Sequence, residues 1–449
     1  MKNALLIFAF LSFYLSSVHA SVEIRSNKLT TGDGLANNSI RYMFQDSKGF
    51  MWMGTVNGLS YYDGNSFVSI YPDPNLPISL ADPRIRNMEE DSNGFLWIAT
   101  LSSLYSCYDL KHGRFVDFTG CGEYKQSYSK KIIASDQSVW LWDNNNGCRR
   151  VVYQDGQFSS QAYKKELGNL SSDKVLFVYE SNDSPGHVWI GTKQGLWKYH
   201  DGKLEAMDTQ GESWEHIFSY DQYTCIITGK KEIYRHSLSN NRLEKIASLT
   251  ELGDTGVITG SLRLQHQWVM FTATGSYILD PVTGKLRRFS RLNIKNGNVT
   301  RDNKGNAWVH NYTGNVWYVN TSTGDIKHFQ FLSSEHLGYI DVERYSIIHD
   351  SRDIIWITTY GNGLFAYDLN TGDLQHFTFE VSHSSHINSN YLQYIIEDRS
   401  GGIWVSSEFS GLSHLEILNK GTLRIYPNGE DASDRSNTIR MLLRGKNGN

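Results

Sequence analysis

The chain has 449 residues and a net charge of −4, and its lysines and arginines are scattered rather than gathered in a basic stripe. This distribution argues against a nucleic-acid-binding protein. Aromatic residues make up 13% of the chain, and 39 glycines stand against 7 prolines. Aromatic residues favour strands and glycine favours turns, so the composition indicates a β protein.

Residues 1–20 have the pattern of a secretory signal peptide. Lys2 precedes an apolar run over residues 4–17, and Val18-His19-Ala20 then offers small residues at the positions that a signal peptidase inspects. The run is too short to span a bilayer comfortably, so we expect a cleaved signal and an exported protein. The residue directly after the expected cleavage point is Ser21, whereas a lipoprotein would have a cysteine there. No second apolar stretch approaches membrane-spanning length. We therefore expect a soluble mature part without a lipid anchor.

A repeat follows the signal peptide along the rest of the chain. In six copies an Asp stands six residues before a Trp, and in five of them a Gly stands three residues before the Trp; Asp353 takes that place in the remaining copy. Two degenerate copies centre on Trp140 and Trp268, and a ninth, without Trp, fits residues 225–234. The repeat residues are Asp46, Gly49, Trp52, Asp91, Gly94, Trp97, Asp183, Gly186, Trp189, Asp302, Gly305, Trp308, Asp350, Trp356, Asp398, Gly401 and Trp404.

The spacing of about 40–50 residues is typical of four-stranded β-propeller blades. In the first copy we predict strands over 39–45, 50–55, 59–62 and 66–71 (A to D), joined by turns at 46–49, 56–58 and 63–65. Asp closes the first turn and Gly permits it, while Trp packs between blades. An acid that recurs in most copies builds the blade, whereas a catalytic pair would occur once. We therefore assign these residues a structural role.

Counting copies predicts an all-β fold with one seven-bladed propeller over residues 21–325 and the first blades of a second, truncated propeller over 326–449. Residues 22–29 look like a lone strand D that completes the seventh blade, and 326–331 would then open the second ring. Residues 437–443 match 38–44, so the chain stops inside a tenth copy. We expect it to be the N-terminal portion of a longer gene product.

The four cysteines are compatible with disulfides in an exported protein, and they allow three pairings. Cys107 with Cys121 is the first pair to test because the two flank one strand and its loop; buried unpaired thiols, including Cys148 and Cys225, are the alternative. No CxxC motif or His/Cys cluster predicts a metal, and the spacing of His336, His383 and His386 is not that of a known site. We expect no metal and no cofactor.

The repeat resembles the two-component-regulator propeller repeat. The resemblance rests on residues 34–40, 45–55 and 57–64, and on the similar segments 361–368 and 397–405. It covers essentially all of residues 22–449, with weak copies from about 205 to 300.

The resemblance implies a periplasmic sensor region of a two-component or hybrid two-component system of Bacteroidetes-type bacteria. Such proteins commonly carry two seven-bladed propellers, a β-sandwich, a transmembrane helix and a histidine kinase, and many sense oligosaccharides and regulate transcription of glycan-use genes. The sequence has no phosphoacceptor histidine motif and no nucleotide-binding box. The chain itself is therefore not expected to be an enzyme, and any membrane anchoring or homodimer would depend on downstream parts of an inner-membrane parent.

Strand order separates the two faces of a propeller. The A–B and C–D turns are short and uniform, whereas the D–A connections on the other face vary in length and chemistry. Variable loops on a rigid scaffold are the usual place of recognition, so we expect an oligosaccharide or other small ligand on the D–A/B–C face. The candidate ligand-binding residues are Trp214, His216, Tyr360, Tyr391, Phe409, Tyr124 and Tyr128.

Two other functions remain open, because β-propellers with the same fold have different functions. One is an enzyme acting on polysaccharide, as a glycosidase or lyase, or a quinoprotein-like protein; residues 280–285 and 368–373 resemble quinoprotein turns, but no adjacent cysteine pair is present. The other is a scaffold that binds a protein partner.

Overall fold

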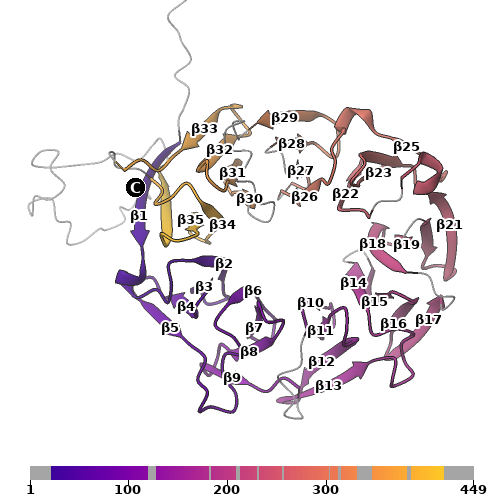
Figure 1. Cartoon of the computed structure of the whole chain (residues 1–449), viewed down its shortest axis with the longest axis horizontal. Helices are drawn as coiled ribbons and strands as arrows, with labels where there is room; N and C mark the ends of the chain where they lie inside the picture. Colours follow the sequence, from indigo (N-terminus) through magenta and orange to yellow (C-terminus); the bar gives the residue numbers. More distant parts are fainter. Residues whose placement is uncertain are drawn as a thin grey trace, which may run out of the picture.

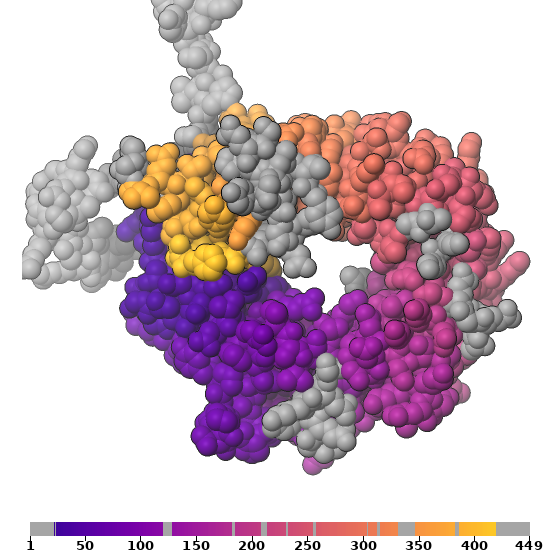
Figure 2. Space-filling view, in the orientation of Figure 1, coloured from indigo at the N-terminus to yellow at the C-terminus, as the bar shows by residue number. Residues whose placement is uncertain are grey.

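The structure, a computed structural model, describes residues 22–119, 128–181, 184–208, 213–229, 232–254, 257–302, 304–311, 315–330, 346–381 and 386–418. Within these ranges, nine four-stranded antiparallel sheets surround a central opening (Figure 1). The first strand of each sheet, strand A, lies nearest the opening, which passes through the space-filling surface (Figure 2).

The first three blades follow one another directly in the chain. Their strands are β2 Ile40–Gln45, β3 Met51–Thr55, β4 Leu59–Tyr62 and β5 Phe67–Ile70; β6 Ile85–Glu90, β7 Phe95–Thr100, β8 Tyr105–Asp109 and β9 Arg114–Val116; and β10 Lys130–Ile133, β11 Val139–Trp142, β12 Cys148–Gln154 and β13 Gln157–Tyr163.

The next three blades include the degenerate copies that the sequence placed around residues 225–234 and Trp268. Their strands are β14 Val175–Ser181, β15 Ser184–Thr192, β16 Gly195–His200 and β17 Lys203–Asp208; β18 Trp214–Asp221, β19 Thr224–Gly229, β20 Glu232–Ser237 and β21 Arg242–Ser248; and β22 Gly260–Leu264, β23 Gln267–Phe271, β24 Ser276–Leu279 and β25 Leu286–Arg288.

The last three blades complete the ring, and short 3-10 helices lie at η1 Thr31–Asp33, η2 Leu249–Leu252 and η3 Ser290–Leu292. The strands are β26 Asn298–Arg301, β27 Ala307–His310, β28 Asn315–Val319 and β29 Ile326–Gln330; β30 Ser346–His349, β31 Ile354–Thr358, β32 Leu364–Asp368 and β33 Leu374–Phe377; and β34 Leu392–Glu397, β35 Ile403–Ser407 and β36 Leu412–Leu418 with β1 Glu23–Leu29.

The prediction of a seven-bladed ring followed by a second propeller is wrong. The strand predicted at 22–29 does form, and it is an outer strand, but β1 pairs with β36 in the ninth sheet, from Glu23 opposite Leu418 to Leu29 opposite Leu412. The strand expected to open a second ring, β29, is instead the outer strand of the seventh sheet, paired with β28. The nine repeats found in the sequence therefore form one ring.

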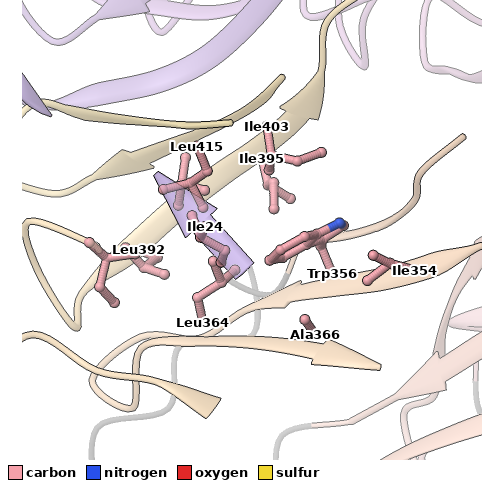
Figure 3. Close-up of a cluster of buried hydrophobic side chains, with 11 residues drawn as sticks. Ile24, Ile354, Trp356, Leu364, Ala366, Leu392, Ile395, Ile403 and Leu415 are labelled. Atoms are coloured by element: carbon pink, nitrogen blue, oxygen red, sulfur yellow. The ribbon is translucent and has the colours of Figure 1, made fainter. Parts of the chain in front are cut away.

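Apolar side chains from neighbouring blades explain why the ninth sheet accepts β1. Ile24 on β1 is 7% exposed and packs with side chains of the eighth and ninth blades (Figure 3). On the other side, Trp404 of the ninth blade lies 5.8 Å from the ring of Tyr62 in the first. These contacts bury apolar surface at the closing junction as at the other junctions.

The Asp-x-x-Gly-x-x-Trp unit is a hydrogen-bonded turn, as predicted. Asp46 Oδ1 accepts from the backbone N–H groups of Lys48 (3.0 Å) and Phe50 (2.9 Å), and Oδ2 accepts from Trp52 Nε1 (2.8 Å). Gly49 has φ 96°, a left-handed conformation that favours glycine. The carboxylate thus ties the turn to the tryptophan that packs between blades.

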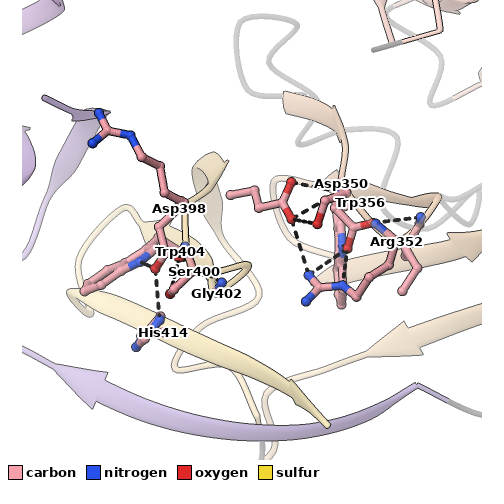
Figure 4. A network of polar contacts seen from close by, with 12 residues as sticks. Asp350, Arg352, Trp356, Asp398, Ser400, Gly402, Trp404 and His414 are labelled. Carbon is pink, nitrogen blue, oxygen red and sulfur yellow. Dashed lines mark hydrogen bonds and ion pairs between the residues drawn. The ribbon is translucent and has the colours of Figure 1, made fainter. Parts of the chain in front are cut away.

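The same bonds join Asp91 to Trp97, Asp350 to Trp356 and Asp398 to Trp404, the last two drawn in Figure 4. In the seventh repeat Asn306 Nδ2 donates to Asp302 in place of Trp308. Asp183 of the fourth repeat lies outside the described residues.

Candidate functional site

Three of the seven predicted ligand residues come together on the D–A/B–C face, over the eighth and ninth blades. Tyr360 lies in the turn between β31 and β32, Tyr391 directly precedes β34, and Phe409 lies in the turn between β35 and β36. Tyr391 is 45% exposed and Phe409 is 72% exposed. We call Tyr360, Tyr391 and Phe409 the aromatic cluster.

Backbone bonds hold the first two rings together. Tyr360 and Tyr391 form an isolated antiparallel bridge, and Gly361 N donates to Asn390 O at 2.8 Å. The two rings meet edge to face, with centroids 5.2 Å apart at 75°. Such a pair is stabilising in itself and presents one ring to solvent. Gly361 has φ 113°, so the turn that positions Tyr360 favours glycine.

A buried carboxylate lies beside the aromatic cluster. Glu408 is 6% exposed, and its backbone N–H donates to Tyr391 O at 3.0 Å. Its side chain accepts a hydrogen bond from Gln393 Nε2 and lies 3.6 Å from the Arg41 guanidinium of the first blade. A buried charge requires such partners. The polar group of Arg41, Gln393 and Glu408 therefore links the aromatic cluster to the inner wall of the ring.

The sequence analysis did not select Arg41, Gln393 or Glu408. A signal existed, because Glu408 occupies the position after strand B that Val56 and Leu101 fill in the first two blades. The signal was weak, because Lys193 is charged at the same position in the fourth blade. Tyr360 occupies the same position in the eighth blade.

Trp214, His216 and Tyr128 do not join the aromatic cluster. Trp214 and Tyr128 are each 1% exposed: Trp214 packs against Tyr234 at 4.9 Å, and the Tyr128 hydroxyl accepts from Arg149 Nε at 3.1 Å. Both begin or precede an inner strand, where aromatic side chains pack inward, so we leave them out of the proposed surface. His216 is half-buried, and burial lowers its pKa. Tyr124 lies outside the described residues.

Cysteine and histidine side chains form no metal site in the described part of the chain, where no group of three or more metal-binding side chains occurs. Cys107 and Cys148 are buried free thiols, and burial raises the pKa of both; Cys121 lies outside the described residues. His386 packs edge-on against Phe377 at 5.9 Å, whereas His336 and His383 are not described. No helix in the described ranges is long and apolar enough to cross a membrane.

Comparison with protein families confirms the resemblance of the repeats. Residues 34–57 and 79–102 match the family described as two component regulator propeller. Each segment runs from the connection before strand A to the turn after strand B and contains one Asp-x-x-Gly-x-x-Trp unit. No curated protein gave a significant match over the chain.

The solved structures that match the chain include bacterial sensor domains. The extracellular domains of two hybrid two component systems of B. thetaiotaomicron, BT4673 and BT3049, are 17% and 19% identical, with TM-scores of 0.40 and 0.32 over 87% of this chain. The chain spans 58% and 65% of their lengths. The Dos1 propeller is 10% identical with a TM-score of 0.51, over 87% of this chain and 94% of that one, which shows the propeller fold alone.

Proposed function

We propose that this chain, which carries two-component-regulator propeller repeats at residues 34–57 and 79–102, is the ligand-sensing region of a two-component signal-transduction protein. Residues 1–20 would direct its export to the periplasm. Its ligand would be an oligosaccharide, and binding would regulate transcription of glycan-use genes through a histidine kinase in the parent protein. The region would bind its ligand without transforming it.

The observation that favours an oligosaccharide is the aromatic cluster beside the polar group of Arg41, Gln393 and Glu408. Exposed aromatic faces can stack on the apolar faces of sugar rings, while side-chain amides and charges bond the hydroxyls. Phe409 and Tyr391 offer the rings, and the neighbouring Glu408 backbone is fixed by its bond to Tyr391. Hydrogen bonding fixes the backbone at Tyr391 and Glu408, while the rings of Tyr391 and Phe409 are exposed to a ligand.

Calorimetric titration of the chain with a panel of short oligosaccharides tests this proposal. For a sugar that binds, Tyr391→Ala and Phe409→Ala should each weaken binding by about tenfold, because an aromatic contact contributes on the order of 1 kcal/mol. Tyr223→Ala is the matched control, since Tyr223 is 59% exposed but lies in an A–B turn on the opposite face. Unchanged affinity in both cluster variants would rule out the aromatic cluster as the binding surface.

The same titration separates the two other functions. Release of shortened sugars during the experiment would support a polysaccharide-degrading enzyme instead. A panel without any binding sugar, together with saturable binding of a purified protein partner, would support a scaffold. Recovery of intact sugar from the complex is the result that our proposal predicts.

A further inference from the structure

A second surface, on the A–B/C–D face between the sixth and seventh blades, carries two arginines that have no carboxylate partner among the described residues. Arg263 on β22 and Arg301 on β26 stand on adjacent inner strands (Figure 1). In the described part of the chain neither guanidinium lies within ion-pair distance of an acidic side chain, and no hydrogen bond engages Arg301. Two nearby cations of this kind favour an anion between them.

The repeat explains why Arg301 is available. Arg301 pairs with the residue before the repeat Trp, and at the same position the second, fourth and ninth blades have Glu90, Glu180 and Glu397. Each glutamate accepts hydrogen bonds from a serine in the turn of the preceding blade. The serines are Ser47, Ser135 and Ser351. These bonds tie neighbouring blades together.

At the junction of the sixth and seventh blades, both partners of the glutamate–serine hydrogen bond are replaced. Arg301 replaces the glutamate, and the preceding turn of the sixth blade is shortened to Gln265 and His266, without a serine. Arg301 is consequently exposed. The position that joins neighbouring blades in these three cases carries the opposite charge here and makes no such bond among the described residues.

The second arginine is fixed in place. Arg263 Nη1 donates to Tyr220 O at 2.8 Å and Nε donates to Gln265 O at 3.1 Å, while its guanidinium lies 5.2 Å from the centre of the Tyr220 ring. These contacts orient the planar group and leave Nη2 for another acceptor. A pre-oriented guanidinium loses little entropy when it binds a carboxylate or sulfate.

Both arginines line two adjoining hollows. One, of about 580 Å³, opens among Arg263, Gln265, His266, Arg301, Thr321 and Ser322. The other, of about 700 Å³, is on the side of the inner strands and includes Tyr179, Ser219 and Tyr220. In a similar hollow lined by the second to fourth blades the charged side chains have partners: Lys131 pairs with Glu89, and Glu180 accepts a hydrogen bond from Ser135. Among the described residues of these hollows, the arginines without an ion-pair partner are therefore those at the sixth and seventh blades.

We propose that Arg263 and Arg301 form a binding site for an oxyanion, the carboxylate or sulfate group of a small ligand. The site is separate from the aromatic cluster and does not depend on the function proposed for it. The Ser322 hydroxyl and the His266 ring, both on exposed residues that line the same hollow, would add polar contacts to the anion.

Calorimetric titration of the full chain with sodium sulfate and with glucuronate, at constant ionic strength, tests the site. We expect saturable binding of at least one probe and about tenfold weaker binding in Arg301→Gln, since charge-assisted hydrogen bonds are lost. Arg301→Lys should retain part of the affinity. Sulfate binding alone would identify a sulfated ligand, and glucuronate binding alone a carboxylated one.

Arg287→Gln is the matched control, because Arg287 is exposed on β25 of the same sixth blade but lines neither hollow. It should bind both probes as the unaltered chain does, and thermal unfolding should show that Arg301→Gln is folded. Equal weakening of binding by Arg301→Gln and Arg287→Gln would indicate a general charge effect and would overturn the proposed site. The absence of saturable binding of either probe would also overturn it. Titration of a neutral oligosaccharide reports on the aromatic cluster separately.

Discussion

His236 shows how a single residue departs from the repeat. It lies on β20, the third strand of the fifth blade, and packs against Trp189 of the fourth blade with centroids 4.6 Å apart. At the equivalent position four other blades have tyrosine, and each ring contacts the tryptophan of the preceding blade: Tyr62, Tyr108, Tyr199 and Tyr367. Burial lowers the pKa of His236 to about 4.

This pKa predicts a loss of stability in mild acid. The unfolded chain binds a proton at His236 near pH 6.5, whereas the folded chain binds it only near pH 4. The unfolded state therefore holds more protons in this window, and stability falls as the pH is lowered through it. The loss should reach at most about 3 kcal/mol.

His236→Phe should remove this part of the acid sensitivity, because phenylalanine cannot take up the proton. Urea unfolding at pH 7 and at pH 4.5 would measure the difference in the free energy of unfolding. His376→Phe, at an exposed position, is the control and should leave the pH dependence as it is. If both variants respond to pH as the unaltered chain does, His236 is not the cause.

Residues could be predicted best where the repeat defines them. The bond between turn acid and tryptophan forms in four of the six copies that have both residues, the first, second, eighth and ninth blades, because its partners are close in sequence. Trp214 and Tyr128 were selected as candidate ligand-binding residues, yet each is only 1% exposed. Whether a side chain at the start of an inner strand faces solvent depends on the neighbouring blade, which local sequence does not describe.

Among the elements, β1 determines how the ring closes. The sequence identified residues 22–29 as an outer strand without a partner of its own, which is correct, but assigned it to the seventh blade. Strand type follows from a local pattern, whereas the partner is set by contacts between residues nearly four hundred positions apart. Ile24 among Leu392, Ile395 and Leu415 supplies part of that information (Figure 3).

Ile24→Ala should lower the free energy of unfolding by about 2–4 kcal/mol, since it removes a buried side chain from the closing blade. The control is Val68→Ala on β5, the outer strand of the first blade, where the side chain is 40% exposed and the change should be within about 0.5 kcal/mol. Chemical denaturation measures both. A cost for Ile24→Ala as small as for Val68→Ala would argue against its burial in the ninth blade.

At the scale of the whole molecule, the junction of the ninth and first blades resembles the other junctions. Arg399 N donates to Gln45 Oε1 at 2.8 Å, its Nη1 donates to Ser47 O at 3.0 Å, and Ser406 Oγ donates to Ile40 O at 3.1 Å. Leu35, Ile40 and Met43 share an apolar cluster with Trp404. The ring therefore closes through side chains as well as through β1.

The number of repeats could be read from the sequence, but the number in one ring could not. Similar blades offer similar faces, so each junction is compatible with another copy. What closes the ring is the angle between successive blades together with the choice of partner for β1. Both are properties of the assembled molecule, whereas the expectation of seven blades came from counting repeats and from assigning residues 22–29 to the seventh blade.

Cross-linking of β1 measures this closure directly. Arg25 and Glu416 are opposite each other in the β1–β36 register and are largely exposed, so Arg25→Cys with Glu416→Cys places two thiols at a distance that a disulfide spans. Arg25→Cys with Asn320→Cys is the matching pair for a seven-bladed ring, because Asn320 follows the partner of Trp308 by two residues, as Glu416 follows the partner of Trp404. After mild oxidation, peptide mass spectrometry should find the 25–416 link and not the 25–320 link; the opposite result would contradict the nine-bladed ring.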